Sequence, residues 1–121
     1  MKLKNVHREP AGLPDHVGGK CWTIWKKSDF LGTMTEVGLN LLDAGLDMEL
    51  HVHDDEEEIY YIIGGVGEVT VGEETEGVKE GDSIYIPLKT LHGIKNVGGY
   101  PLVYLAVTAN PIGLAKKNQV S

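Results

Sequence analysis

Cysteine is scarce in this sequence of 121 residues, which excludes some kinds of covalent cross-link and metal site. Cys21 is the only cysteine, so neither an intrachain disulfide nor a cysteine-rich zinc site can form. A chain without disulfides fits a reducing compartment. The first ten residues are polar and lack the apolar core of a signal peptide. We therefore expect a cytoplasmic protein.

Positive charge is also scarce. Arg8 is the only arginine, and the formal net charge is -7. An acidic protein is repelled by the phosphate backbone of nucleic acids and by anionic membrane surfaces. No stretch approaches the roughly 18 consecutive apolar residues of a membrane-spanning helix. We therefore expect neither nucleic acid nor a membrane as a partner.

Sustained helical periodicity is lacking after residue 20. Instead, glycines are abundant, 16 in all, and many of them separate short runs that are rich in Val, Ile, Tyr and Thr. These runs cover residues 21–26, 34–42, 48–53, 59–63, 68–71, 83–86, 92–96 and 102–108. Such runs predict an all-β sandwich or barrel. We place one barrel at residues 20–110, an irregular N-terminal arm at 1–19 and a C-terminal tail at 111–121.

Three histidines and a carboxylate stand at the ends of these runs. His51 and His53 lie two residues apart, so in an extended strand both imidazoles point to the same face. Glu58 ends an acidic run and begins the next strand, and His92 opens a later one. Imidazole and carboxylate ligands suit divalent transition metals. A single pair of histidines at this spacing is more often a surface feature, so the prediction depends on all four residues.

Two motifs strengthen this interpretation, because together they resemble the conserved motifs of the cupin superfamily. The first motif is matched by Gly45, His51, His53, Glu58 and Gly65. The second is matched by Gly81, Pro87, His92 and Asn96. Lys89 stands where the second motif has a glycine, which suggests a different turn before His92.

The resemblance implies a double-stranded β-helix, the jelly-roll barrel of cupins. It also implies one divalent transition metal (Mn, Fe, Ni, Zn or Cu) held by His51, His53, Glu58 and His92. Glu57 remains an alternative to Glu58, because the family allows two spacings after the histidine pair. Strand alternation places Glu49 on the same face as His51, as a further candidate ligand.

Alternation also predicts which side chains surround the metal. Tyr60 and Ile62 share the face of Glu58, while Ile94 and Asn96 share the face of His92. Tyr60 is the candidate catalytic residue, as a general acid or a hydrogen-bond donor to a substrate. The alternative is a core tyrosine whose hydroxyl only bonds a neighbour.

Family resemblance favours a small-molecule enzyme of the dioxygenase, decarboxylase, isomerase or lyase type. The alternatives are a non-catalytic binding or sensing protein and a metal-free binding barrel. Residues 20–110 contain no arginine, the residue best suited to clamp carboxylates and phosphates, so we expect a neutral or weakly anionic substrate.

The opposite face of the strand after Glu58 carries Ile59, Tyr61 and Ile63. An apolar row of this kind on a small barrel needs a cover. We therefore expect a homodimer that buries it.

Overall fold

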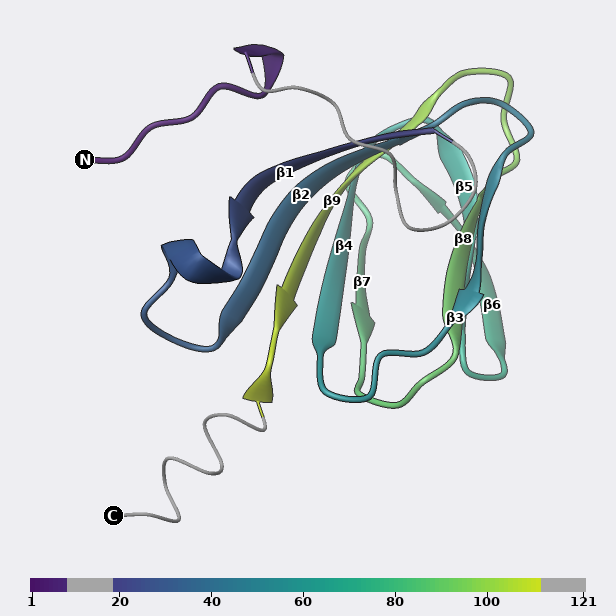
Figure 1. The fold of residues 1–121 in the computed structure, drawn as a ribbon. Coiled ribbons are helices and arrows are strands. Elements are labelled where there is room, and N and C mark those ends of the chain that lie inside the picture. Colours follow the sequence, from purple (N-terminus) through teal and green to yellow (C-terminus); the bar gives the residue numbers. More distant parts are fainter. Residues whose placement is uncertain (9–18, 112–121) are drawn as a thin grey trace.

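Two antiparallel sheets pack face to face in the computed structural model, which describes residues 1–8 and 19–111 (Figure 1). The strands are β1 (Lys20–Lys26), β2 (Met34–Leu42), β3 (Asp47–His51), β4 (Glu57–Gly64), β5 (Val66–Val71), β6 (Glu74–Lys79), β7 (Ser83–Ile86), β8 (His92–Asn96) and β9 (Leu102–Ala109). One sheet has the order β1-β2-β9-β4-β7, and the other has the order β3-β8-β5-β6. This is the predicted jelly-roll, or double-stranded β-helix, fold.

Strand β6 is the one that the sequence did not predict. Its side chains are exposed except for Val78, so it lacks the apolar alternation that marks a half-buried strand. It pairs with β5 in a hairpin, with Val71 opposite Glu74. The two-residue loop begins with Gly72 at φ 63°, a conformation that favours glycine in tight hairpins.

Alternation in β4 divides the molecule into an inside and an outside. Glu58, Tyr60 and Ile62 are buried between the sheets. Their neighbours Ile59 and Tyr61 point outward and are 45% and 47% exposed. Inward side chains of both sheets form one apolar core, made of Leu42, Tyr60, Ile62, Val69, Val78, Ile86, Ile94, Leu102 and Tyr104.

Gly65, the last residue of the first motif, shows why glycine is needed between β4 and β5. Its φ is +91°, which side chains rarely adopt. A Cβ at this position would also lie 2.6 Å from the carbonyl oxygen of Pro101. The turn therefore packs directly on the backbone at the start of β9.

Short 3-10 turns interrupt the extended chain: η1 (Val6–Arg8) in the arm and η2 (Lys27–Asp29) after β1. In the described part of the chain, no helix has the length and apolar character needed to cross a bilayer. Most of the predicted arm and nearly all of the predicted tail lie outside the described residues.

Candidate metal centre

Four residues from three strand ends converge between the sheets. His51 closes β3, His53 follows two residues later, Glu58 is near the start of β4, and His92 opens β8. Each offers one ligand atom, and these atoms lie within 4.8 Å of one another. Ligands about 2.1 Å from an octahedral ion stand about 3 Å apart when adjacent and about 4.2 Å apart when opposite. The cluster therefore needs only a small contraction to hold an ion.

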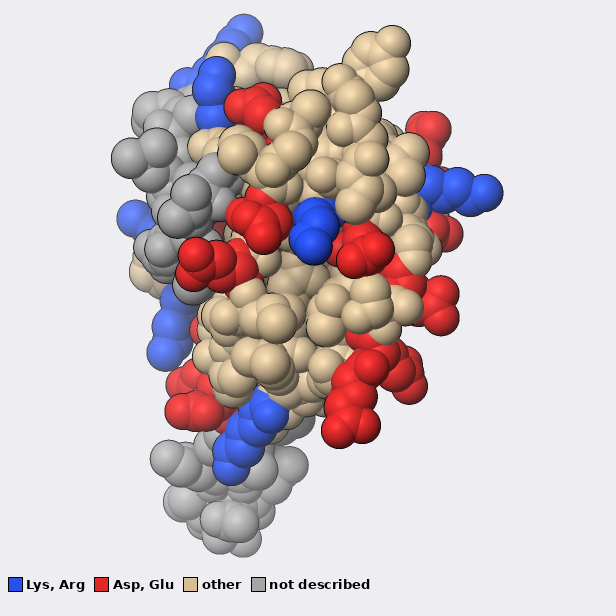
Figure 2. Space-filling view, turned by 90° about the vertical axis from the view of Figure 1, so that its right-hand side faces the viewer, with Lys and Arg blue, Asp and Glu red and all other residues tan. Residues whose placement is uncertain are grey.

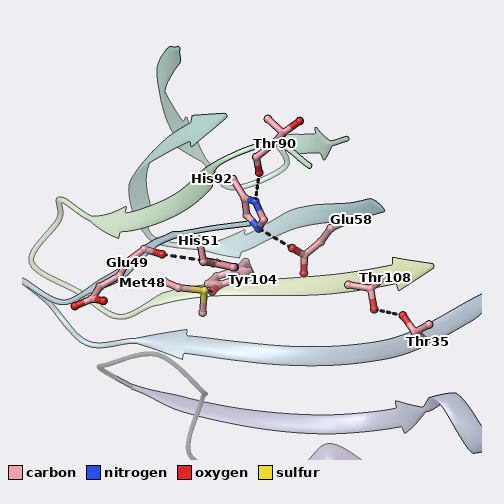
Figure 3. Close-up of polar contacts among 9 residues, drawn as sticks. All are labelled: Thr35, Met48, Glu49, His51, Glu58, Thr90, His92, Tyr104 and Thr108. Atoms are coloured by element: carbon pink, nitrogen blue, oxygen red, sulfur yellow. Dashed lines mark hydrogen bonds and ion pairs between the residues drawn. The ribbon is translucent and has the colours of Figure 1, made fainter. Parts of the chain in front are cut away.

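A backbone contact sets the tautomer of His92. Its Nδ1 lies 2.9 Å from the carbonyl oxygen of Thr90, and because a carbonyl only accepts, Nδ1 must donate (Figure 3). The Nε2 atom then carries the lone pair and points into the cluster. A carbonyl that accepts from the other ring nitrogen in this way fixes the orientation of metal-binding histidines.

His51 is held in the same manner. Its Nδ1 donates to the carbonyl oxygen of Glu49 at 2.8 Å, which leaves Nε2 free of the ring proton. The strand register shifts between Met48 and His51, so the simple alternation used for the sequence prediction fails here. The side chain of Glu49 is exposed and outside the cluster, so Glu49 is not placed as a ligand.

The strongest sign that the site suits a cation is a pair of buried acceptors. Glu58 Oε1 and His92 Nε2 lie 3.3 Å apart, and neither has a hydrogen-bond partner. The residues are 8% and 1% exposed, so water does not solvate them freely. With neutral His92, two lone pairs face each other, an arrangement that costs free energy unless a proton or cation lies between them.

Protonation is therefore favoured at His92 when no metal is bound. Burial lowers the pKa of His92, but the Glu58 carboxylate and the Thr90 carbonyl, which both accept hydrogen bonds from the protonated ring, outweigh this effect together with the charge of Glu58. The net result is a pKa raised above the usual 6.5. The same site that attracts a proton has the charge and geometry to attract a divalent ion.

The side chain of Glu57, the alternative ligand, points away from the cluster, to the outer face of the sheet. Its carboxylate accepts a hydrogen bond from the Tyr85 hydroxyl at 3.0 Å on the outer face of the sheet. Alternation of β4 thus places Glu58 inside and Glu57 outside.

Lys89 keeps the turn that a glycine would make. Its φ is 55°, the one positive value at a non-glycine residue among those described. The expectation of a different turn was therefore wrong. The amide of Lys89 donates to the carbonyl of His53 at 2.9 Å. This bond joins the segment before His92 to the segment after β3, which helps to explain why the left-handed backbone is tolerated.

A cavity of about 130 Å³ lies beside the cluster, and Tyr60 lines it as expected. Burial raises the pKa of Tyr60 well above its usual 10.0, and the charge of Glu58 adds to this effect. Burial likewise raises the pKa of Tyr104, whose ring lies 4.9 Å from that of Tyr60. Both phenols keep their protons at neutral pH, so they act as donors.

The other three expectations for the lining were wrong. Ile62 and Ile94 belong to the closed core. Asn96 donates to the carbonyls of Leu42 and Tyr100, at 3.0 and 2.8 Å, and so ties together the loops around β8. Strand alternation correctly predicted that these side chains face inward, but it does not predict how far along the barrel axis from the cavity they lie.

The residues on the opposite wall of the cavity were not predicted from the sequence. It consists mainly of Cys21, Glu36, Asn40, Met48, Tyr104 and Thr108, from β1, β2, β3 and β9. At its rim, the Thr35 hydroxyl donates to Glu56. The same hydroxyl lies 2.6 Å from the Thr108 hydroxyl (Figure 3). This contact anchors the acidic loop between His53 and Glu58.

Comparison with known proteins identifies the domain. Residues 39–108 match the family described as Cupin domain. An uncharacterized protein of Methanocaldococcus jannaschii is 40% identical over 68% of this chain and 66% of its own length. The xanthan biosynthesis protein XanB of Xanthomonas campestris is 33% identical over 71% of this chain, but the match spans only 18% of XanB.

Solved structures show the same architecture. A predicted oxalate decarboxylase of Thermotoga maritima superposes with a TM-score of 0.83 at 24% identity, over 90% of this chain and 99% of that one. Oxalate decarboxylase of Bacillus subtilis gives a TM-score of 0.73 at 26% identity, over 87% of this chain and 29% of the enzyme. KdgF of Halomonas gives 0.75 at 18% identity, over 91% and 94% of the two chains.

Proposed function

Since this chain belongs to the cupin family, we propose that His51, His53, Glu58 and His92 bind one divalent transition metal that activates a small molecule. The observation that carries the proposal is the buried contact between Glu58 Oε1 and His92 Nε2, two partnerless atoms 3.3 Å apart. A cation between them would satisfy both. Mn, Fe, Ni, Zn and Cu all accept this ligand set.

The proposed chemistry is that of an open metal site. Four protein ligands leave two positions of an octahedral ion for a ligand with two oxygen donors, and a bound ion would polarise those oxygens. The backbone contacts of the two Nδ1 atoms direct the Nε2 atoms of His51 and His92 to the ion, and His92, whose pKa is raised, would give up its Nε2 proton when the ion binds.

Tyr60 is proposed as the residue that acts on the substrate. It lines the cavity beside Glu58, and its raised pKa keeps the phenolic proton in place. It would therefore donate a hydrogen bond or a proton to a developing oxyanion rather than remove a proton. Such a donor serves decarboxylase, isomerase, lyase and dioxygenase reactions alike.

The test is elemental analysis of protein purified without a histidine tag, as wild type, as His51→Ala and as His92→Ala. We expect close to one equivalent of one transition metal per chain in the wild type and almost none in either variant. Glu57→Gln is the matched control, because it removes a neighbouring charge from the outer face and should keep the metal.

Wild-type protein that stays metal-free after incubation with each of these ions would overturn the proposal. Metal bound in full with no turnover of any candidate substrate would instead favour the non-catalytic binding alternative.

A further inference from the structure

The cavity wall opposite the metal ligands carries one carboxylate, that of Glu36. We propose that this wall selects small ligands that offer a hydroxyl or ammonium group and carry no negative charge, and that Glu36 disfavours dicarboxylates. This inference rests on the proposed metal site and adds a substrate class to it.

The local structure of β2 directs Glu36 into the cavity. Glu36, Gly38 and Asn40 lie on the inward face of this strand, and both Glu36 and Asn40 line the cavity. A Cβ on Gly38 would lie 3.1 Å from Glu36 Oε1, so a side chain at this position would crowd the carboxylate. Thr23 donates a hydrogen bond to the same oxygen at 3.1 Å. The charge is thus placed by two neighbouring strands.

A charge count then limits the ligand. Among the described residues that line the cavity, Glu36 and Glu58 are the only ones with a formal charge at neutral pH when the histidines are neutral ligands. A dicarboxylate would bring two further negative charges close to the Glu36 carboxylate, and none of the described lining residues is an arginine or lysine that could pair with them.

The charged side chains on the outside of the molecule are also mostly negative. Among the charged side chains on the face formed by β3, β8, β5 and β6, Asp and Glu are more prominent than Lys and Arg (Figure 2). The whole chain has a formal net charge of -7. A field of this sign slows the approach of anions and favours neutral or cationic ligands.

The remaining wall residues suit a small polar ligand. Asn40 and Thr108 are almost fully buried and line the cavity with an amide and a hydroxyl. The cavity volume of about 130 Å³ is slightly below the ~150 Å³ that encloses a benzene molecule in an engineered protein. A ligand of about six non-hydrogen atoms would fill it.

The experiment titrates protein loaded with Co²⁺ and follows the absorption of the bound ion. The probes are oxalate, glycolate and ethanolamine, which are similar in size and carry two, one and no negative charges. Glu36→Gln removes the charge and keeps the shape. We expect it to bind oxalate about tenfold more tightly than the wild type, glycolate by a smaller factor, and ethanolamine no more tightly.

Glu57→Gln is the matched control, since it removes the same charge from the outer face. It should leave all three affinities within about twofold of wild type, because exposed charges are screened by solvent and salt. An equal change for all three probes in Glu36→Gln, or no change for oxalate, would overturn the role of Glu36 and leave the metal site standing. Failure of wild-type protein to hold Co²⁺ would sink both proposals.

Discussion

Replacing Glu58 with glutamine should stabilise the metal-free protein at high pH while it abolishes metal binding. In the wild type, Glu58 Oε1 faces His92 Nε2 at 3.3 Å, and neither atom has a partner. Because His92 Nδ1 donates to Thr90, Nε2 is an acceptor when the ring is neutral. A glutamine amide would donate to it.

The size of the effect follows from the contact that is gained. A net hydrogen bond contributes about 0.5–1.5 kcal/mol, and removing an unsatisfied buried acceptor relieves about 1–3 kcal/mol more. Allowing for imperfect geometry, we expect a gain of about 1–2 kcal/mol in the free energy of unfolding. For a domain of this size that is a rise in Tm of about 5 °C or more.

The sign of the effect depends on pH. The pKa of His92 is raised in the folded state, so the ion pair with Glu58 stabilises the wild type below the unfolded value near 6.5. That contribution is lost as the pH rises through the folded pKa. At about pH 5.5 the metal-free wild type should therefore be the more stable protein, and at about pH 9 the variant should be.

Thermal unfolding of both proteins, followed by circular dichroism in the presence of a chelator, measures their stabilities at the low and the high pH. Added metal should then reverse the order at high pH, because an ion at 100 times its Kd stabilises the wild type by about 2.7 kcal/mol and leaves the variant unchanged. A metal-free variant that is less stable than the wild type at every pH would refute the argument that two acceptors face each other.

Three further predictions concern other contacts. Lys89→Gly should be neutral or stabilise the fold by up to about 1 kcal/mol by relieving the left-handed backbone, whereas Lys89→Val should destabilise it by more than about 1 kcal/mol, as measured by denaturant unfolding. Thr35→Val should loosen the acidic loop and weaken metal affinity by about tenfold in a competition titration. Thr70→Val, which removes an exposed hydroxyl pair that does not contact the acidic loop, should not. Tyr61→Arg should shift the expected homodimer to monomer in light scattering; a wild-type monomer would refute the dimer.

The cluster of four residues could be predicted from the sequence because local spacing places three of them and the resemblance to the second cupin motif adds His92. His51, His53 and Glu58 lie within eight residues of one another, and strand alternation fixes which of them point inward. Glu57 and Glu58 were hard to separate by spacing alone, yet alternation against Tyr60 and Ile62 gave the inward carboxylate that the structure places in the cluster.

Failures of the sequence prediction occurred where the backbone departs from regular alternation. The register shift between Met48 and His51 turns Glu49 outward, and no residue type in this segment signals it. Strand β6 was missed because its pairing with β5 rather than its own side chains makes it a strand. Lys89 adopts the glycine conformation because a hydrogen bond to His53 holds it there, which is a long-range effect.

The cavity wall shows why the candidate metal ligands could be predicted from the sequence, whereas the residues that would select a substrate could not. The ligands lie on β3, β4 and β8, whereas Glu36 and Thr108 lie on β2 and β9, and the sheet order β2-β9-β4 brings them to one cavity. No spacing rule connects these segments, so only the fold shows that Glu36 faces the metal site. Since the proposed ion would contact Glu58 and a substrate would contact Glu36, substitutions at the two positions should change metal affinity and ligand choice separately.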